Sequence, residues 1–236
     1  MDQELNIRIH TFGCKVNTYD SGLLQQGLKT SYPKPVHIVN TCAVTAEATR
    51  EALRLVKKLK RENPQSMVVV TGCSAQVDTE KFTELCEADL VVANSHKSQL
   101  AKILEDYFDG RASSKVLKSN IFLNSDLGAG GGTEEEHTRA FLKIQDGCNS
   151  FCTYCVIPFA RGRSRSIPVR QLVERIQELQ RSGTKEVVIT GVHIADYEDD
   201  GLYLDDLIEA ILRETAIPRL RLSSLEPREI TDRLLE

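Results

Sequence analysis

The sequence predicts an α/β fold in two parts, an N-terminal open parallel-sheet domain followed by a partial, truncated βα barrel. Two observations support this fold class. Short runs of β-branched residues alternate with segments of helical periodicity along most of the chain, as expected for parallel strands joined by crossover helices. A polar and then glycine-rich stretch interrupts the alternation near the middle of the chain, which indicates a connection between two domains.

Composition excludes several classes of protein. The chain has 236 residues, of which 41% are apolar and 27% charged, which is typical of an ordinary globular protein with one or two domains. Its net charge of -4 gives no overall nucleic-acid signature, so any RNA contact must come from a local basic patch. The first residues lack a signal-peptide pattern, and no apolar run approaches the roughly 20 residues that cross a bilayer. We therefore predict a cytoplasmic protein that does not contact the membrane.

Four strands and three helices are predicted in the N-terminal domain, residues 1–110. Residues 6–12 alternate apolar and polar side chains and are rich in β-branched residues, as in a half-buried strand. Residues 67–71 are almost continuously apolar, as expected for a strand that is covered on both faces. The other strands are predicted at 36–40 and 89–92, and the helices at 18–28, 46–62 and 97–108.

Residues 111–137 are predicted to link this domain to a second one at 138–236, where the alternation resumes. Its strands are predicted at 140–144, 185–190 and 219–223, and its helices at 169–183, 203–215 and from 229 onward. Parallel strands with crossover helices cannot close a barrel in three units. We therefore expect the chain to be a truncated piece of a longer protein.

The second domain carries a C-x-x-x-C-x-x-C array formed by Cys148, Cys152 and Cys155. Thiolates are soft ligands that suit zinc or iron–sulfur clusters. A zinc site needs four closing ligands, whereas this loop offers three and no further Cys or His nearby in sequence. A [4Fe–4S] cluster held by three thiolates leaves one iron open. The alternative is a loop of buried small thiols, which gives no reason for this spacing.

Three further cysteines, Cys14, Cys42 and Cys73, each follow a predicted parallel strand directly. Ligand crevices of open α/β sheets form at the carboxyl ends of the strands, so these residues are expected to converge. The alternative is three unrelated core thiols. Cys86 has no such placement and is interpreted as a partly buried thiol in a helix.

The cysteine array, with Tyr154 before its last member, resembles the radical S-adenosylmethionine (SAM) superfamily. Several phrases narrow the resemblance to the methylthiotransferases: TFGCKVN (11–17), VNTCAVT (39–45), VTGCSAQ (70–76), ITGVHIADY (189–197) and LSSLEP (222–227). Within that family the chain is most similar to the MtaB-type branch, whose members methylthiolate N6-threonylcarbamoyladenosine next to the tRNA anticodon. The second domain would then be a partial radical-SAM barrel.

This resemblance implies two [4Fe–4S] clusters, one held by Cys148, Cys152 and Cys155 and the other by Cys14, Cys42 and Cys73. In the implied mechanism, reduction of the first cluster splits SAM into methionine and a 5′-deoxyadenosyl radical, which removes hydrogen from C2 of the adenine. Sulfur associated with the second cluster is then inserted, and another SAM supplies the methyl group. No side chain is implied as an acid or base. The implied partners are tRNA, an electron donor such as a flavodoxin-like protein and a sulfur source, and we expect a monomer.

Further site residues are hypotheses. Gly191, His193 and Glu226 follow strands on the edge that carries the cysteine loop, and we expect them to contact SAM. The R-x-R-x-R run of Arg161, Arg163 and Arg165 would lie on one face of a strand and bind substrate, through RNA phosphates or the threonylcarbamoyl carboxylate. The alternative is a solvated charged face.

Three other functions stay open at this point. The same chemistry could act on isopentenyladenosine in tRNA or on a ribosomal protein. The chain could instead be a non-catalytic iron–sulfur electron-transfer module, which needs no open iron. It could also be an RNA-binding structural module, whose binding would survive the loss of every cysteine.

Overall fold

A parallel five-stranded sheet forms the N-terminal half of the computed structural model, which describes residues 6–29, 31–112, 114–125, 127, 139–223 and 225–235. Its strands follow chain order across the sheet, and each pairs with its neighbour in parallel. They are β1 (Ile7–Thr11), β2 (Val36–Thr41), β3 (Met67–Gly72), β4 (Leu90–Ala93) and β5 (Val116–Leu117).

Helices cover both faces of this sheet. On one face α1 (Lys15–Gly27) and α5 (Leu100–Phe108) pack against the sheet, and α5 follows the 3-10 turn η1 (Asn94–Gln99). On the other face lie α2 (Ala46–Glu62), α3 (Cys73–Val77) and α4 (Thr79–Thr83). Successive residues of β3 enter opposite cores, which explains its continuous apolar sequence.

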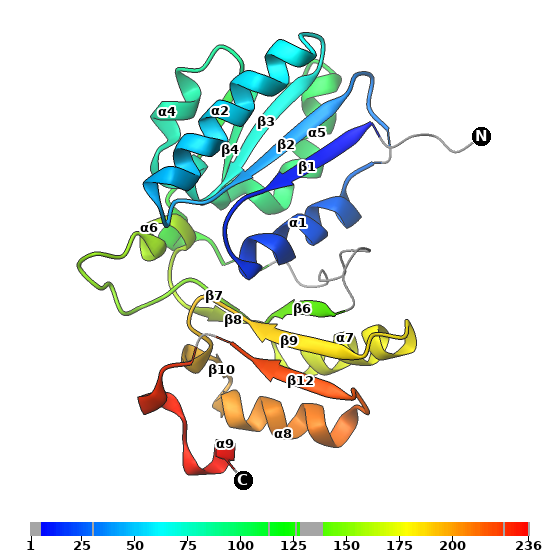
Figure 1. Cartoon of the computed structure of the whole chain (residues 1–236), viewed down its shortest axis with the longest axis vertical. Coiled ribbons are helices and arrows are strands. Elements are labelled where there is room, and N and C mark those ends of the chain that lie inside the picture. Colours follow the sequence, from blue (N-terminus) through cyan, green and yellow to red (C-terminus); the bar gives the residue numbers. More distant parts are fainter. Residues whose placement is uncertain are drawn as a thin grey trace.

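The second sheet is parallel and has the order β12-β9-β6. Its strands are β6 (Ala140–Lys143), β9 (Glu186–Thr190) and β12 (Arg219–Leu222), and it packs with α7 (Val169–Arg181) and α8 (Leu204–Glu214). Helix α1 lies between the two sheets (Figure 1). Its Leu24 belongs to the core of the first sheet and its Tyr19 to the core of the second, so α1 joins the two halves.

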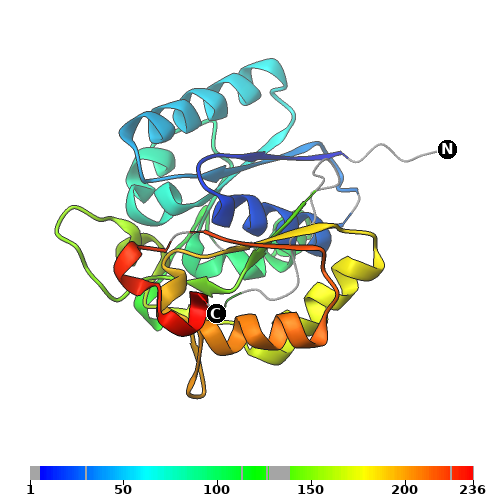
Figure 2. The same cartoon turned by 60° about the horizontal axis from the view of Figure 1, so that its bottom comes forward.

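Short elements surround the cysteine loop. Strand β7 (Gln145–Asp146) pairs antiparallel with β8 (Arg165–Ser166), and α6 (Ile157–Arg161) lies between them in sequence. The remaining short elements are η2 (Ile121–Leu123), η3 (Ile194–Asp196), β10 (Glu198–Asp199), β11 (Leu202–Tyr203), η4 (Pro227–Glu229) and α9 (Asp232–Leu235). Both views show the loop between β7 and α6 extending away from the two sheets (Figures 1 and 2).

The predicted α/β class is confirmed, and the predicted strands all form, within one or two residues at their ends. Three local predictions were wrong. Residues 97–99 belong to the 3-10 helix η1 rather than to the α-helix that follows it, and the helix predicted from 229 begins at Asp232. Cys86 is exposed in a turn instead of partly buried in a helix. The predicted connection contains β5 and η2, while its glycine-rich part lies outside the described residues. Among the described residues, no helix combines the length and apolar character needed to cross a bilayer.

Candidate functional site

The structure brings Cys14, Cys42 and Cys73 to one edge of the N-terminal sheet. Each follows one of three adjacent parallel strands, and carboxyl ends of such strands meet at the same edge. The turn at Gly13 has a φ of 95°, and a Cβ there would lie 2.5 Å from Cys42 Sγ, so this turn lies directly on Cys42. All three thiols are free, with Cys14 exposed and the other two buried. Burial, together with the adjacent Cys73 and Cys14, raises the pKa of Cys42.

Hydrogen bonds between strand ends hold this first triad in place. Thr41 Oγ1 donates to the Thr71 carbonyl at 2.6 Å and accepts from the Ala75 amide at 3.2 Å. Ser74 Oγ donates to the Cys42 carbonyl at 2.6 Å. Gly72 has a φ of 97°, and a Cβ there would lie 2.4 Å from Thr41 backbone atoms. Only glycine therefore fits at position 72, where the chain turns from β3 into Cys73 in contact with the backbone of β2.

Two buried asparagines connect the loops that carry Cys14 and Cys42. Asn17 Nδ2 donates to the Phe12 carbonyl at 2.8 Å and to the Thr41 carbonyl at 2.9 Å. Asn40 Nδ2 donates to the Asn17 carbonyl at 3.0 Å. Sequence reasoning assigned neither residue a role. The available signal was limited to Asn40, a polar residue near the end of a mainly apolar strand, which needs a local partner when it is buried.

The second triad lies on the loop between β7 and α6. The Cys148 amide donates to the Gly162 carbonyl at 3.1 Å, and the Cys155 amide donates to the Cys152 carbonyl at 2.9 Å. Gly147 has a φ of 78°, and a Cβ there would lie 2.0 Å from the Arg163 carbonyl oxygen. The base of the loop is therefore closed tightly, while Cys152 is exposed and Tyr154 is 90% exposed.

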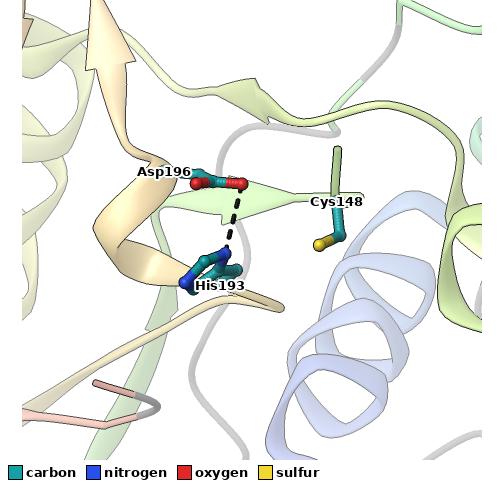
Figure 3. A group of neighbouring side chains, drawn as sticks. All are labelled: Cys148, His193 and Asp196. Atoms are coloured by element: carbon teal, nitrogen blue, oxygen red, sulfur yellow. Dashed lines mark ion pairs between the residues drawn. The ribbon is translucent and has the colours of Figure 1, made fainter. Parts of the chain in front are cut away.

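His193 lies next to this triad, between two carboxylates. Its Nδ1 is 3.2 Å from Asp196, and its Nε2 is 2.5 Å from Glu229 Oε1. Burial alone would lower the pKa of His193, but the hydrogen bond that it donates to Glu229 and the charge of Asp196 raise it. Figure 3 shows the Cys148 thiol turned toward the His193–Asp196 pair, and the donor atoms of the three residues lie within 4.8 Å of one another. This arrangement orients the imidazole beside the cysteine loop.

The other two predicted SAM contacts, Gly191 and Glu226, contact neighbouring residues of the protein. A Cβ at Gly191 would lie 2.8 Å from Ile194 and 3.0 Å from the Gln145 carbonyl, so the close approach that this glycine permits is to the protein itself. Glu226 is exposed and pairs with Arg228 at 3.0 Å. Glu229, which sequence reasoning missed, is the carboxylate that contacts His193.

Gln145 organises the strand ends around the second triad and was also missed. Its side chain is fully buried, and its Oε1 accepts from the Val192 and His193 amides at 3.1 and 3.0 Å. Its Nε2 donates to the Gly147 carbonyl at 2.7 Å and to Ser164 Oγ at 2.8 Å. One amide group thus links the loop after β9 to both ends of the cysteine loop.

A buried network of charges connects the two halves of the chain. The side chain of Lys97 is 11% exposed, and each of the other side chains is at most 9% exposed. In the order α1, η1, β6, β7 and α6, the members are Asp20, Lys97, Lys143, Asp146 and Arg161. Asp20 accepts ion pairs from Lys97 at 3.1 Å and Lys143 at 2.8 Å. The cations hold the pKa of Asp20 well below its ordinary value despite burial.

Arg161 is a member of this network whose charge interacts with the cysteines of the first triad. It donates to both Asp146 oxygens at 3.0 Å, and to Asn17 Oδ1 at 2.5 Å. Burial alone would lower its pKa, but Asp146, Cys73 and Asp20 raise it. The adjacent Ala160 carbonyl accepts from Asn94, which also donates to Cys73 Sγ at 3.6 Å. Helix α6 therefore joins the two cysteine triads physically.

The predicted row of three arginines on one strand face does not form. Arg161 ends helix α6 and is 3% exposed within the charge network. Arg165 lies in β8 and donates to the Asn124 and Arg161 carbonyls. Arg163 is exposed, with its guanidinium carbon 6.0 Å from the centroid of the Phe151 ring. Of the three, Arg163 is therefore the one that is exposed.

Comparisons with known proteins match both halves of the chain. Residues 6–93 match the model of the uncharacterized protein family UPF0004, and residues 142–236 match that of the radical SAM superfamily. The chain is 38% identical to the threonylcarbamoyladenosine tRNA methylthiotransferase MtaB of Aquifex aeolicus, over 98% of this chain and 59% of that protein. It is 36% identical to MtaB of Rickettsia prowazekii, over 100% of this chain and 56% of that protein.

A further relative and a solved structure extend the comparison. The tRNA-2-methylthio-N(6)-dimethylallyladenosine synthase of Thermodesulfovibrio yellowstonii is 31% identical over 98% of this chain and 55% of that protein. The chain thus spans between half and three fifths of these relatives. The radical S-adenosylmethionine methyltransferase TsrM of Kitasatospora setae has the same fold, with a TM-score of 0.56 and 15% identity over 83% of this chain and 43% of that one.

Proposed function

Because the chain belongs to the radical-SAM methylthiotransferase family, we propose that it carries two domains of an enzyme that adds a methylthio group to C2 of N6-threonylcarbamoyladenosine in tRNA. The observation that carries this proposal is the pair of cysteine triads, each at the carboxyl edge of a parallel sheet and joined by α6. The choice of modified adenosine is supported by the names of the relatives that are 36–38% identical. A tRNA substrate implies a cytoplasmic enzyme.

Both triads have the chemistry that a [4Fe–4S] cluster requires. Each offers three free thiols at a strand-end edge, which matches three-thiolate ligation with one open iron. Cys148, Cys152 and Cys155 would hold the cluster that binds SAM, and Cys14, Cys42 and Cys73 the auxiliary cluster. When bound, the two clusters and SAM would supply the radical and sulfur chemistry. No acid or base side chain is needed, because the C2–H bond of adenine is not acidic.

The side chains of the protein would fix positions and exclude water. Gln145 holds the loop after β9 against the base of the cysteine loop, and this contact would form one wall of the SAM site. His193 is oriented by Asp196 and Glu229 and lies beside Cys148, so it is a candidate SAM contact together with Gly191 and Glu226. The charge network around Arg161 would fix the distance between the clusters.

Partners follow from the same proposal. The enzyme would require tRNA, an electron donor of the flavodoxin type and a source of sulfur, and would act as a monomer. Arg163 is the predicted cation for an RNA phosphate or the threonylcarbamoyl carboxylate, because it is exposed while Arg161 is buried.

The relative named as a dimethylallyladenosine synthase supports one alternative, the same chemistry on isopentenyladenosine. The decisive experiment incubates the anaerobically reconstituted protein with SAM, dithionite and two tRNA anticodon stem-loops, one carrying each modified adenosine. The RNA is then digested, and its nucleosides are separated by chromatography and identified by mass spectrometry. A methylthio product from the threonylcarbamoyl RNA alone supports the proposal. A product from the isopentenyl RNA alone would reverse the assignment, and SAM that leaves the reduced cluster spectrum unchanged would indicate an electron-transfer module.

A further inference from the structure

Three of the seven phenylalanines in the chain gather on the surface beside the second cysteine triad. Phe122 of η2 stacks with Phe151 of the cysteine loop, with ring centroids 5.9 Å apart and planes inclined by 27°. Phe159 of α6 meets both rings edge-on, with centroid distances of 5.9 and 6.1 Å. Phe151 is 40% exposed and Phe159 is 54% exposed. We call these three residues the aromatic patch.

The backbone at Phe151 shows that its position is constrained. Phe151 has a φ of 47°, in the left-handed region that bulky residues rarely occupy. Such strain persists where the surroundings over-determine the conformation, and it concentrates at functional sites. Here the strained residue lies between Cys148 and Cys152 in sequence, and its ring lies against Phe122 on the surface instead of in a core.

The surroundings of the aromatic patch are basic, in a chain whose net charge is -4. The guanidinium carbon of Arg163 lies 6.0 Å from the Phe151 ring centroid, and Lys118 is exposed four residues before Phe122. The two segments that build the patch, residues 115–125 and 147–168, contain neither Asp nor Glu, although these make up 34 of the 236 residues. This charge distribution complements a polyanion.

We propose that the aromatic patch and Arg163 bind an unpaired nucleobase and an adjoining phosphate of the RNA loop that is modified. This inference rests on the proposed function and names the surface that holds its substrate. Single-stranded RNA is bound by aromatic rings on which bases stack, combined with cations that track the backbone. Both features occur here beside the loop that carries the second triad, where the reacting base must arrive.

The aromatic patch could instead be covered by a further stretch of polypeptide, but the order of the strands argues against this occupant. The strands of the second sheet lie in chain order from β6 through β9 to β12, so the next strand of a barrel would pair with β12. The aromatic patch lies at the other side, around α6 and next to the N-terminal sheet (Figure 1). The absence of Asp and Glu from residues 115–125 and 147–168 also favours RNA over a protein surface of mixed charge.

The test measures the affinity of the reconstituted protein for a fluorescent anticodon stem-loop, by anisotropy at several salt concentrations. Phe122→Leu keeps an apolar side chain but loses the stacking ring, and should weaken binding at least about fivefold. Phe122→Tyr restores a ring and should bind like the unmodified protein. Arg163→Gln should weaken binding and reduce the slope of log Kd against log salt by about 0.7, the value for one single-strand phosphate. Arg170→Gln, at an exposed arginine on α7, is the matched control and should change neither quantity.

Each result has a defined meaning. If the unmodified protein binds and methylthiolates the RNA, and Phe122→Leu and Arg163→Gln bind equally well, the patch is not the RNA surface while the proposed function stands. If Phe122→Leu lowers the melting temperature and leaves RNA affinity unchanged, the patch packs against protein and the inference is wrong. If the unmodified protein neither binds nor modifies the RNA, the proposed function fails together with this inference.

Discussion

Replacing Arg161 by methionine should destabilise the cluster-free protein by about 3–5 kcal/mol, the cost of removing one partner from a buried ion pair. Arg161 is 3% exposed and donates two hydrogen bonds of 3.0 Å to Asp146 and one of 3.2 Å to Asp20. Asp20 and Asp146 share two cations, Arg161 and Lys143, and the loss of Arg161 leaves both buried carboxylates with incomplete charge compensation. It also leaves Asn17 Oδ1, which lies between the two halves of the chain, without its partner.

The free energy of unfolding is measured in urea by circular dichroism, with the midpoint and the slope fitted separately. Arg170→Met is the matched control, because the Arg170–Glu174 pair is exposed, and it should cost less than about 0.5 kcal/mol. In the double variant Arg161→Met/Asp146→Asn the carboxylate that lost its two hydrogen bonds from Arg161 is removed as well. It should therefore be more stable than the sum of the two single changes predicts, by about 0.5–3 kcal/mol.

Equal stabilities of Arg161→Met and Arg170→Met would refute this reasoning. The buried network would then not form in solution, and the two halves of the chain would not be joined through Arg161. A strict additivity of the Arg161 and Asp146 changes would contradict their direct contact even if each change alone were costly.

Three other changes test separate parts of the site. Burial alone would raise the pKa of Asp146 from 3.8, but its two cations lower it to about 2. The ionised carboxylate therefore contributes about 2 kcal/mol to the free energy of unfolding above about pH 5, and this contribution is lost as the pH falls to 2. Urea midpoints measured at pH 2–6 should show this pH dependence in the unmodified protein and lack it in Asp146→Asn. Gly72→Ala would place a Cβ 2.4 Å from the Thr41 backbone, so it should unfold at lower temperature than Gly183→Ala, where φ is also positive (91°) but no atom lies within 4 Å. Equal melting temperatures would show that the contact with β2 is not tight. Gln145→Leu removes the acceptor of two amides and should halve the iron content, whereas an unchanged iron content would show that the second triad assembles without it.

Local sequence patterns predicted helices and strands well where short-range signals determine their ends. Helix α2 has the bounds that its periodicity predicted, because a staggered apolar stripe and a following Pro64 define it. The convergence of Cys14 and Cys42 at one edge followed from a general rule for parallel strands, so no long-range contact had to be known.

The contacts between distant segments could not be predicted in this way. Asp20 and Lys143 are 123 residues apart and have no local pattern that marks them as buried partners. In the R-x-R-x-R run the residue types are identical, so the sequence predicted identical roles. The short helix α6 instead turns Arg161 into the interior and leaves Arg163 at the surface. Tertiary packing decides between such positions.

The central claim, two separate cluster sites on one chain, is tested most directly by counting iron. The protein and its Cys148/Cys152/Cys155→Ala variant are reconstituted anaerobically, and iron and sulfide are quantified in both. We expect about eight irons in the unmodified protein and about four in the variant, one four-iron cluster per triad. About four irons in the unmodified protein and none in the variant would show that Cys14, Cys42 and Cys73 hold no cluster, and would contradict the proposed function.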